Sequence, residues 1–258
     1  MTGRRPAPPT PRPRRLLLAA ALLAAFHAAT PPPSPAGDAP FTSPSNFGLT
    51  GLLDTPTARV MPVNSLRAGA TRIDPYRYYF LGASPFRRLE VVGRLTEVSG
   101  VPAFTNLSAS SYGDFKDKAV DVKFQFLAEG KYAPAIAAVV MDPHGTRIYP
   151  AQALVASKQI FPFDFTVGIG NGRYGKRPLP ASGESFRAEM FTDPKAWWRD
   201  AQVFGGIEFA PTGTLSLVAE YSPVRYDLQD RDPAQAKYFR EPVPSKFNVG
   251  LRWRPVRW

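Results

Sequence analysis

The chain of 258 residues contains no cysteine and only two histidines. Without cysteine it can form neither a disulfide nor a thiolate metal site, and it is expected to carry no lipid-anchored N-terminus. His144, the only histidine after residue 30, lies in a Pro-His-Gly turn. It has no second histidine for a metal site or a catalytic pair. The sequence therefore predicts a protein that is not an enzyme and that binds neither a metal nor a cofactor.

Long apolar runs are also missing. After residue 30, no stretch approaches the roughly 20 apolar residues that a membrane helix needs. Hydrophobic residues nevertheless make up 44 % of the chain. If the protein crosses a membrane, it is expected to do so with strands.

The positive charge is concentrated at the start of the chain. There are 32 Lys and Arg against 21 Asp and Glu, a formal charge of +11. Five arginines precede the first apolar run, and removing them leaves 32 − 5 = 27 basic residues, an excess of +6. These are scattered along the chain, whereas a nucleic-acid-binding protein gathers them on one face. No nucleic-acid partner is expected.

The first residues are typical of a secretory leader. Arg14 and Arg15 are followed by the apolar run 16–25, which has the length of a signal-peptide core and is too short for a membrane anchor. The predicted organisation is a cleaved signal peptide with the start of a linker over 1–36, a disordered linker over 37–46, and a β-barrel domain over 47–258. Cleavage after Ala36 is one alternative.

From residue 66 onward, apolar and polar residues alternate. Val120, Val122 and Phe124, for example, alternate with Asp121 and Lys123. This period of two predicts strands with one apolar face and one polar face. The expected strands lie near 66–73, 77–84, 88–97, 120–126, 133–141, 151–159, 163–170, 203–209, 215–221 and 247–253. Their lengths suit a tilted bilayer crossing, so the fold class is an all-β, antiparallel outer-membrane-type barrel of about 10–12 strands.

Turns of two kinds separate the strands. Short turns are expected at 62–65, 142–145 and 211–213, and long polar interruptions near 99–116, 173–200 and 222–245. Short turns on one rim and long loops on the other are typical of outer-membrane barrels. A soluble periplasmic β-sandwich is the alternative fold. Aromatic residues near the strand ends favour the barrel, since they could form interfacial girdles: Tyr76, Tyr78, Tyr79, Phe80, Phe161, Phe163, Trp197, Trp198, Trp253 and Trp258.

Several strings of residues carry a family resemblance. Residues 48–59 (GLTGLLDTPTAR) and 74–80 (DPYRYYF) resemble the first two blocks of the YjbH family of exopolysaccharide-biosynthesis outer-membrane proteins. Further matches, in the same order, lie at 117–124, 154–158, 204–221 and 244–251. The resemblance implies an outer-membrane β-barrel used in capsule or matrix production. It also implies outer-membrane lipid as a partner, and an exopolysaccharide chain and other secretion proteins as further partners. Typical members are longer, which leaves open whether the barrel is complete in this chain.

The charged residues predicted to face inward form the candidate functional set. They are Glu90, Arg94, Asp121, Lys123, Asp164, Glu208, Glu220 and Arg252. Side chains can fill most of the interior of a barrel of about ten strands. The favoured interpretation is therefore a network of ion pairs that satisfies buried charges. A polar path for a sugar chain is the second interpretation.

Residues 48–62 are apolar but do not alternate. Pro56 and Pro62 would interrupt a central sheet ladder, so this segment, which also contains Asp54, is predicted to lie inside or across the barrel. Arg59 would then need a carboxylate partner, because an unpaired buried charge is costly. Glu208, Glu220 and Asp121 are the candidates.

The functional hypothesis is a non-enzymatic barrel in the outer membrane of a Gram-negative bacterium. It would support exopolysaccharide production or export, as a channel or as a component of an assembly. A soluble periplasmic scaffold or binding module is one alternative. A membrane-embedded enzyme that modifies lipid or glycan is another, with Glu208 and Glu220 facing one another across a hairpin.

Overall fold

A computed structural model describes residues 41–103, 113–180 and 185–255. Ten strands form one sheet, and each pairs antiparallel with the next in the chain. They are β1 (Ser65–Ile73), β2 (Tyr76–Phe86), β3 (Leu89–Pro102), β4 (Asp114–Leu127), β5 (Ala135–Met141), β6 (Ala151–Ile160), β7 (Phe163–Gly172), β8 (Gln202–Phe209), β9 (Leu215–Tyr221) and β10 (Phe247–Trp253). The predicted antiparallel all-β fold is confirmed. The predicted signal peptide, residues 37–40 of the linker and Trp258 lie outside the described residues.

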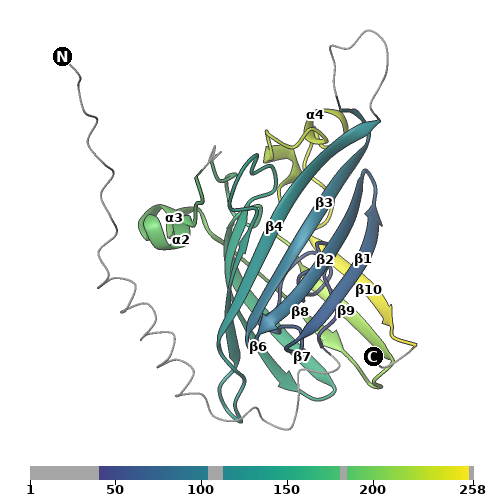
Figure 1. Ribbon diagram of the computed structural model, residues 1–258, viewed down its shortest axis with the longest axis vertical. Helices are drawn as coiled ribbons and strands as arrows, with labels where there is room; N and C mark the ends of the chain where they lie inside the picture. The colour runs from purple at the N-terminus through teal and green to yellow at the C-terminus, as the bar shows by residue number, and fades with distance from the viewer. Residues whose placement is uncertain (1–40, 104–112, 181–184, 256–258) are drawn as a thin grey trace, which may run out of the picture. The chain divides into compact units, whose positions relative to one another are not determined.

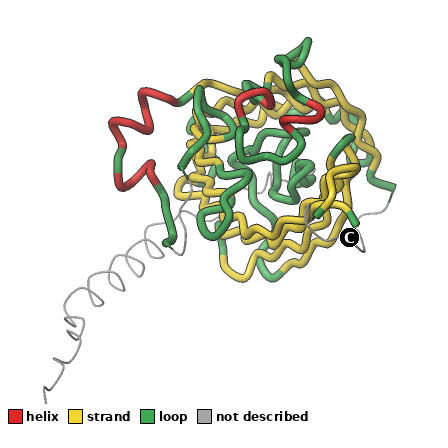
Figure 2. The backbone as a smooth tube through the Cα atoms, turned by 90° about the horizontal axis from the view of Figure 1, so that it is seen from above, coloured by secondary structure: helices red, strands yellow, loops and turns green. Residues whose placement is uncertain are grey.

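The sheet curls around a segment without strands (Figures 1 and 2). It is not closed, since the strand pairings of the described residues include none between β1 and β10. We call the concave side the inner face and the convex side the outer face. A β-sandwich needs two packed sheets, whereas the described strands form a single one.

The two faces of the sheet have opposite chemistry. On β4, Asp121 and Lys123 are fully buried on the inner face, while Val120 is 52 % and Phe124 42 % exposed on the outer face. The same alternation holds for β7, β9 and β10. Because side chains of a strand point alternately to its two faces, the charged residues of these three strands lie on the inner face and their Phe, Leu and Trp residues on the outer face.

The connections differ at the two ends of the sheet. Three long connections, β3–β4, β7–β8 and β9–β10, all join an odd strand to the next even strand. In an antiparallel sheet whose strands follow chain order, these connections share one end, which we call the long-loop rim. The other end, the short-turn rim, has the two-residue connections 87–88 and 161–162. The three predicted long loops thus share one rim. The predicted turn at 142–145 was placed wrongly, because the β5–β6 connection also joins an odd strand to an even one and lies at the long-loop rim, as does the two-residue β1–β2 connection.

The helices are few and short. They are α2 (Glu189–Thr192), α3 (Pro194–Asp200), α4 (Gln235–Tyr238) and the 3-10 helix η1 (Tyr226–Leu228), all in the long connections. Within the described ranges, no helix has the length and apolar character needed to span a membrane.

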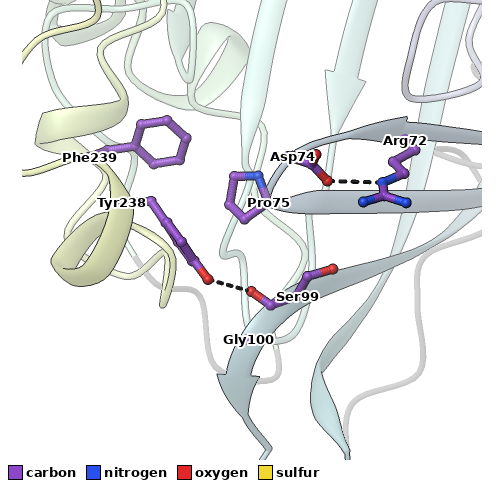
Figure 3. Close-up of a pocket in the computed structure, with 7 residues that line it drawn as sticks. All are labelled: Arg72, Asp74, Pro75, Ser99, Gly100, Tyr238 and Phe239. Carbon is purple, nitrogen blue, oxygen red and sulfur yellow. Dashed lines mark hydrogen bonds and ion pairs between the residues drawn. The ribbon is translucent and has the colours of Figure 1, made fainter.

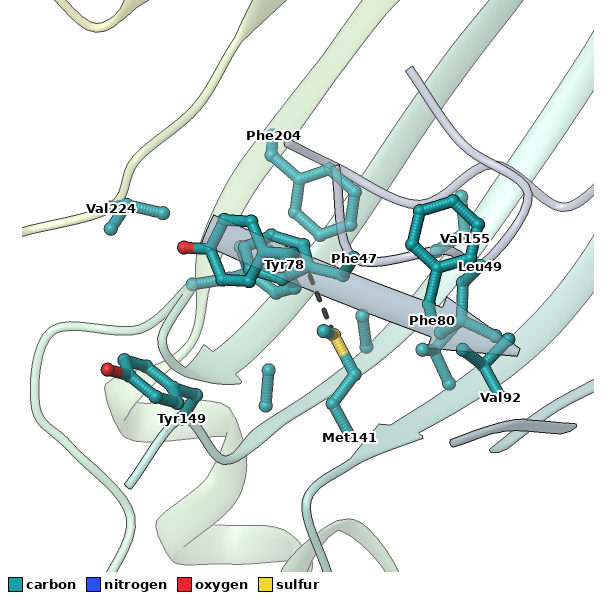
Figure 4. Close-up of a cluster of buried hydrophobic side chains, with 14 of the residues drawn as sticks. Phe47, Leu49, Tyr78, Phe80, Val92, Met141, Tyr149, Val155, Phe204 and Val224 are labelled. Atoms are coloured by element: carbon teal, nitrogen blue, oxygen red, sulfur yellow. Dashed lines mark hydrogen bonds between the residues drawn. The ribbon is translucent and has the colours of Figure 1, made fainter. Parts of the chain in front are cut away.

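Residues 41–62, which we call the inner segment, lie against the inner face. Phe47 and Leu49 are buried with Tyr78, Phe80 and Phe204 of the sheet (Figure 4). This confirms the predicted position of residues 48–62. Residues 41–46, assigned to the linker from the sequence, also belong to the inner segment, and Phe41 among them is buried.

Four of the nine described residues of the predicted aromatic girdle are wrong. Tyr76, Tyr78 and Phe80 are buried on the inner face, because only the odd residue, Tyr79, of that alternating stretch faces outward. Trp197 is buried between its own helix, α3, and the sheet. The girdle residues that the structure leaves exposed are Tyr79, Phe161, Phe163, Trp198 and Trp253.

One glycine of the inner face is required by packing. A Cβ atom at Gly168 would overlap the ring of Phe204 on the neighbouring strand. Gly168→Ala is expected to lower the free energy of unfolding by about 1–3 kcal/mol, the usual cost of overpacking. Gly93→Ala on the outer face is the matched control, since its Cβ would meet nothing closer than 3.9 Å. Urea unfolding of both variants in detergent micelles checks this; equal midpoints would contradict it.

Candidate functional site

All eight predicted inward-facing charged residues lie on the inner face. Arg252 is partly buried and the other seven are buried. Most of them bind the inner segment, and the rest bind one another. The eight charged residues predicted from the sequence thus lie together around the inner segment.

Arg59 of the inner segment forms a buried ion-pair group with two carboxylates. Its Nη2 and Nε atoms lie 2.6 and 3.1 Å from the two carboxylate oxygens of Asp164, and its Nη1 lies 2.5 Å from Oε2 of Glu129. Glu129 also accepts a hydrogen bond of 2.8 Å from Lys158. These contacts fix the end of the inner segment near the short-turn rim, where β7 begins.

The predicted partners of Arg59 were wrong. Asp121 pairs with Arg94 at 3.0 Å, Glu208 pairs with Arg252, and Glu220 binds backbone amides of the inner segment. The alternation of a strand reveals which face a side chain takes. The alternation does not show how far along the strands the inner segment extends, and this distance decides which carboxylate lies next to Arg59. Glu129, in the β4–β5 turn, was missed because no periodicity marks a turn residue.

Glu220 holds a turn of the inner segment. Its carboxylate accepts hydrogen bonds from the backbone N–H groups of Leu53, Asp54 and Thr55, at 3.1, 2.8 and 3.1 Å. The Thr55 hydroxyl donates to it at 2.8 Å and the Asn248 amide at 2.9 Å. Successive backbone N–H groups that converge in this way form a favourable site for an anion. Glu220 therefore serves as a fixed anion for this turn.

Lys123 and Glu90 bind the backbone of the inner segment at Thr50 and Arg59. Lys123 Nζ donates to the carbonyl oxygens of Thr50 and Arg59, at 2.5 and 2.7 Å, and lies 3.3 Å from Glu90 Oε2. Glu90 Oε1 accepts from the Thr50 N–H at 2.7 Å. This pair satisfies backbone groups that no strand ladder could satisfy.

Arg252 completes the set from β10. It donates to the carbonyl oxygens of Gly51 and Leu52, at 2.8 and 2.6 Å, and pairs with Glu208 at 2.6 Å. In this conformation the charged residues hold the inner segment in place. That arrangement favours the ion-pair interpretation over an open polar path.

A cluster at the long-loop rim was not anticipated from the sequence. The Arg173 guanidinium lies 4.8 Å from the ring centre of Phe47 and 5.0 Å from that of Tyr226. The Tyr226 hydroxyl donates to Asp54 Oδ2 at 3.2 Å. Burial raises the pKa of the Tyr226 hydroxyl, as does the neighbouring Asp54 charge. Arg173 and Tyr226 lie in segments that the sequence predicts only as loops, which is why they were missed.

Asp142, directly after β5, is a buried carboxylate with few partners. Its Oδ2 accepts from the Tyr149 N–H at 2.9 Å, and its Oδ1 has no partner among the described residues. Burial raises the pKa of Asp142 to about 6, and the nearby Asp117 charge acts in the same direction.

The Asp142 carboxyl makes stability depend on pH. Its folded pKa exceeds the unfolded value near 4, so the folded state binds the proton more tightly, and stability falls as pH rises from about 4 to 6. Asp142→Asn is expected to raise the free energy of unfolding above pH 6 by roughly 2–3 kcal/mol, and to change it little at pH 4. Asn also tolerates the positive φ of 47° at this position. Urea unfolding at both pH values, with exposed Asp230→Asn as control, checks this; a gain that is the same at both pH values would contradict it.

A shallow pocket of about 410 Å³ opens at the long-loop rim (Figure 3). Its lining combines the aromatic side chains of Tyr238 and Phe239 with the exposed ion pair Arg72–Asp74, whose atoms are 2.9 Å apart. Tyr238 donates to the Ser99 carbonyl at 3.0 Å. In the described part of the chain, no group of three His, Asp or Glu side chains could hold a metal ion.

Comparisons with known proteins agree with the resemblance seen in the sequence. The family model of YjbH, described as exopolysaccharide biosynthesis protein YbjH, matches residues 43–258. A relative from Escherichia coli (strain K12), described as an uncharacterized lipoprotein YjbH, is 34 % identical over 242 residues. That match covers 88 % of this chain and 33 % of the relative, so the chain spans about a third of the relative's length. No solved structure matches.

The family match includes the inner segment from residue 43 and all ten strands. It therefore covers the whole set of contacts described above. The chain belongs to the YjbH family of exopolysaccharide biosynthesis proteins.

Proposed function

We propose that the chain is a non-enzymatic outer-membrane β-barrel that supports exopolysaccharide production or export as a component of an assembly. The observation that carries this proposal is the distribution of side chains over the curled sheet. Large apolar residues are exposed on the outer face, and charged residues are buried on the inner face. A bilayer is the environment that would cover such an outer face. The relative's description as a lipoprotein supports an envelope location.

The proposal requires the sheet to close in the membrane. Unpaired backbone groups at a sheet edge are not tolerated in lipid. Both edges already bind the same short stretch of the inner segment: Arg67 of β1 donates to the Thr42 carbonyl, and Arg254, just after β10, donates to the Ser43 hydroxyl at 2.9 Å. Closure, by β1–β10 pairing or by further strands, would build on this shared contact.

A role in assembly, rather than as an open channel, is supported by the filled interior. The inner segment packs Phe47 and Leu49 into the core and is held by Glu220, Lys123 and Arg252. An export path through the lumen would need this segment to leave. The long-loop rim, with the Tyr238 and Phe239 pocket, is the surface we assign to the polymer or to other secretion proteins.

The non-enzymatic part of the proposal rests on how the carboxylates are used. Glu208 and Glu220, the pair that a membrane-embedded hydrolase would need, are bound to arginines and backbone amides. A general acid or base must instead reach the substrate proton. The structural partners of both carboxylates explain why these charges are buried in the interior.

Cell fractionation and a secretion assay test the proposal. The protein is expected in the outer-membrane fraction, with a gel mobility that changes on boiling. Deletion of the gene is expected to reduce surface polysaccharide and leave the intracellular precursors intact. Release by osmotic shock as a soluble species would contradict the barrel. Hydrolysis of purified polymer that Glu220→Gln abolishes would contradict the non-enzymatic role, provided that the variant keeps its folded mobility.

A further inference from the structure

The β7–β8 connection folds back onto the outer face of the sheet. We call residues 185–201, which include α2 and α3, the outer flap (Figure 1). Met190 and Trp197 of the flap are buried against outward side chains of β5, β6 and β7. The residues beneath them are Ala138, Val140, Leu154 and Ile169.

The outer flap is also held by polar contacts. Gln152 and Asn171 face outward at the long-loop ends of β6 and β7. The Met190 N–H donates to Gln152 Oε1 at 2.7 Å, and the Asn171 amide donates to the Trp197 carbonyl at 3.1 Å. These two polar side chains would be costly against lipid without such partners. The flap is therefore a fixed part of the outer face.

The side of the flap that faces away from the sheet is aromatic. Phe186, Phe191 and Trp198 are 65 %, 69 % and 56 % exposed. Aromatic residues of this kind are enriched at the level of lipid headgroups. Their exposure continues the apolar outer face toward the long-loop rim.

A cluster of positive charges adjoins the exposed Trp198. Arg199 Nη2 lies 2.9 Å from Asp200 Oδ2, and Lys176 Nζ donates to the Arg199 carbonyl at 2.9 Å. The hydrogen bond from Arg199 lowers the pKa of Asp200, and the charges of Arg177 and Lys176 add to this effect. The charge of Asp193 also acts on Arg199, so three cations against two carboxylates leave one positive charge at the surface.

The position of the flap along the strands can be compared with the distribution of charge on the outer face of β4. On β4 the outward residues change from apolar Val122 and Val120 to Lys118 and Lys116 toward the long-loop rim. Lys116 pairs there with Glu97 of β3 at 3.6 Å. The flap contacts β6 and β7 near the same rim. The outward residues that the flap covers on β5, Ala138 and Val140, are in register with Phe124 and Val122 of β4. The flap therefore lies beside the apolar residues that precede Lys118 on the way to the rim.

We propose that the outer flap is a lipid-binding surface at the membrane–water interface. Phe186, Phe191 and Trp198 would lie among the headgroups, and the cation cluster of Lys176, Arg177 and Arg199 would bind the phosphate groups of anionic membrane lipid. Interfacial segments with aromatic and basic residues bind lipid by buried apolar area together with attraction to anionic headgroups. This inference rests on the proposed membrane location of the sheet.

Single-cysteine labelling tests the inference, because the chain has no cysteine of its own. The full chain is inserted into phosphatidylcholine vesicles containing phosphatidylglycerol, with a fluorophore at one of three positions. Phe191→Cys probes the flap, Leu217→Cys the outer face of β9, and Tyr132→Cys an 85 % exposed turn. We expect a headgroup spin label to quench the probe at 191, an acyl-chain spin label to quench the one at 217, and iodide to quench the one at 132.

The outcomes separate the flap from the barrel. If iodide quenches the probe at 191 as strongly as the one at 132, while lipid quenches the probe at 217, the flap inference is overturned and the barrel stands. If iodide rather than lipid quenches the probe at 217, the proposed function itself fails. Heat-dependent gel mobility confirms that each variant is folded.

A charge-removal pair tests the cation cluster. We expect the headgroup spin label to quench the probe at 191 more strongly in vesicles that contain phosphatidylglycerol than in pure phosphatidylcholine. The double variant Lys176→Gln with Arg177→Gln, made in the Phe191→Cys chain, is expected to abolish this difference. Arg87→Gln with Lys131→Gln, two exposed cations near the short-turn rim, is the matched control and should retain it. Retention of the extra quenching in both pairs would overturn phosphate binding by the cluster.

Discussion

Replacing Arg59 by Met is expected to lower the free energy of unfolding by about 3–5 kcal/mol, because breaking a buried ion pair leaves an uncompensated charge. Asp164 would lose both hydrogen bonds to its carboxylate from Arg59. Glu129 would keep its contact with Lys158. Urea unfolding in detergent micelles, followed by the change in gel mobility, measures the effect.

Two further variants show whether the loss comes from burial. Asp164→Leu added to Arg59→Met is expected to recover much of the stability, since replacing both members of a buried pair by apolar residues is often neutral. Arg72→Gln breaks the exposed pair with Asp74 and should cost no more than about 1 kcal/mol. An Arg59→Met variant as stable as the Arg72→Gln variant would contradict the role of Arg59.

Replacing Glu220 by Ala is expected to release part of the inner segment. Three backbone N–H groups, those of Leu53, Asp54 and Thr55, would lose their acceptor in the interior. Each buried unsatisfied group costs about 1–3 kcal/mol, so a loss of roughly 3 kcal/mol or more is expected. In planar bilayers, the variant should show conductance where the original protein is closed.

The controls for Glu220 vary its charge and its position. Glu220→Gln keeps an acceptor oxygen and should show a smaller loss than Glu220→Ala. Glu241→Ala removes an exposed carboxylate of the β9–β10 connection and should stay within about 0.5 kcal/mol of the original protein. If Glu220→Ala neither lowered stability nor opened the barrel, the inner segment would not depend on this carboxylate.

The strands and their faces could be predicted from the sequence because alternation is a local property. Asp121 and Lys123 lie between Val120, Val122 and Phe124, and this order alone assigns each side chain to a face. The inner segment could be predicted for a related reason. Pro56 and Pro62 are incompatible with a central strand, so the apolar residues near them had to pack elsewhere.

The contacts of the inner segment depend on information that alternation does not contain. Which carboxylate meets Arg59 depends on how far residues 41–62 run along the sheet axis, and turn residues such as Glu129 carry no periodic signal. The outer flap shows the same limit. Nothing in residues 189–200 indicates that Trp197 packs onto the sheet while Trp198 remains exposed; that difference arises only when the two helices meet Val140 and Ile169.

The most direct test of the proposed barrel is a labelling scan along β9, whose residues run from Leu215 to Tyr221. Single cysteines at Leu215, Leu217 and Ala219 place a fluorophore on the outer face, and those at Ser216 and Val218 place it on the inner face. The account predicts that acyl-chain spin labels quench only the first three probes and that iodide quenches none of the five. Strong iodide quenching at Leu217 and Ala219, without quenching by lipid, would contradict a membrane-embedded barrel with a filled interior.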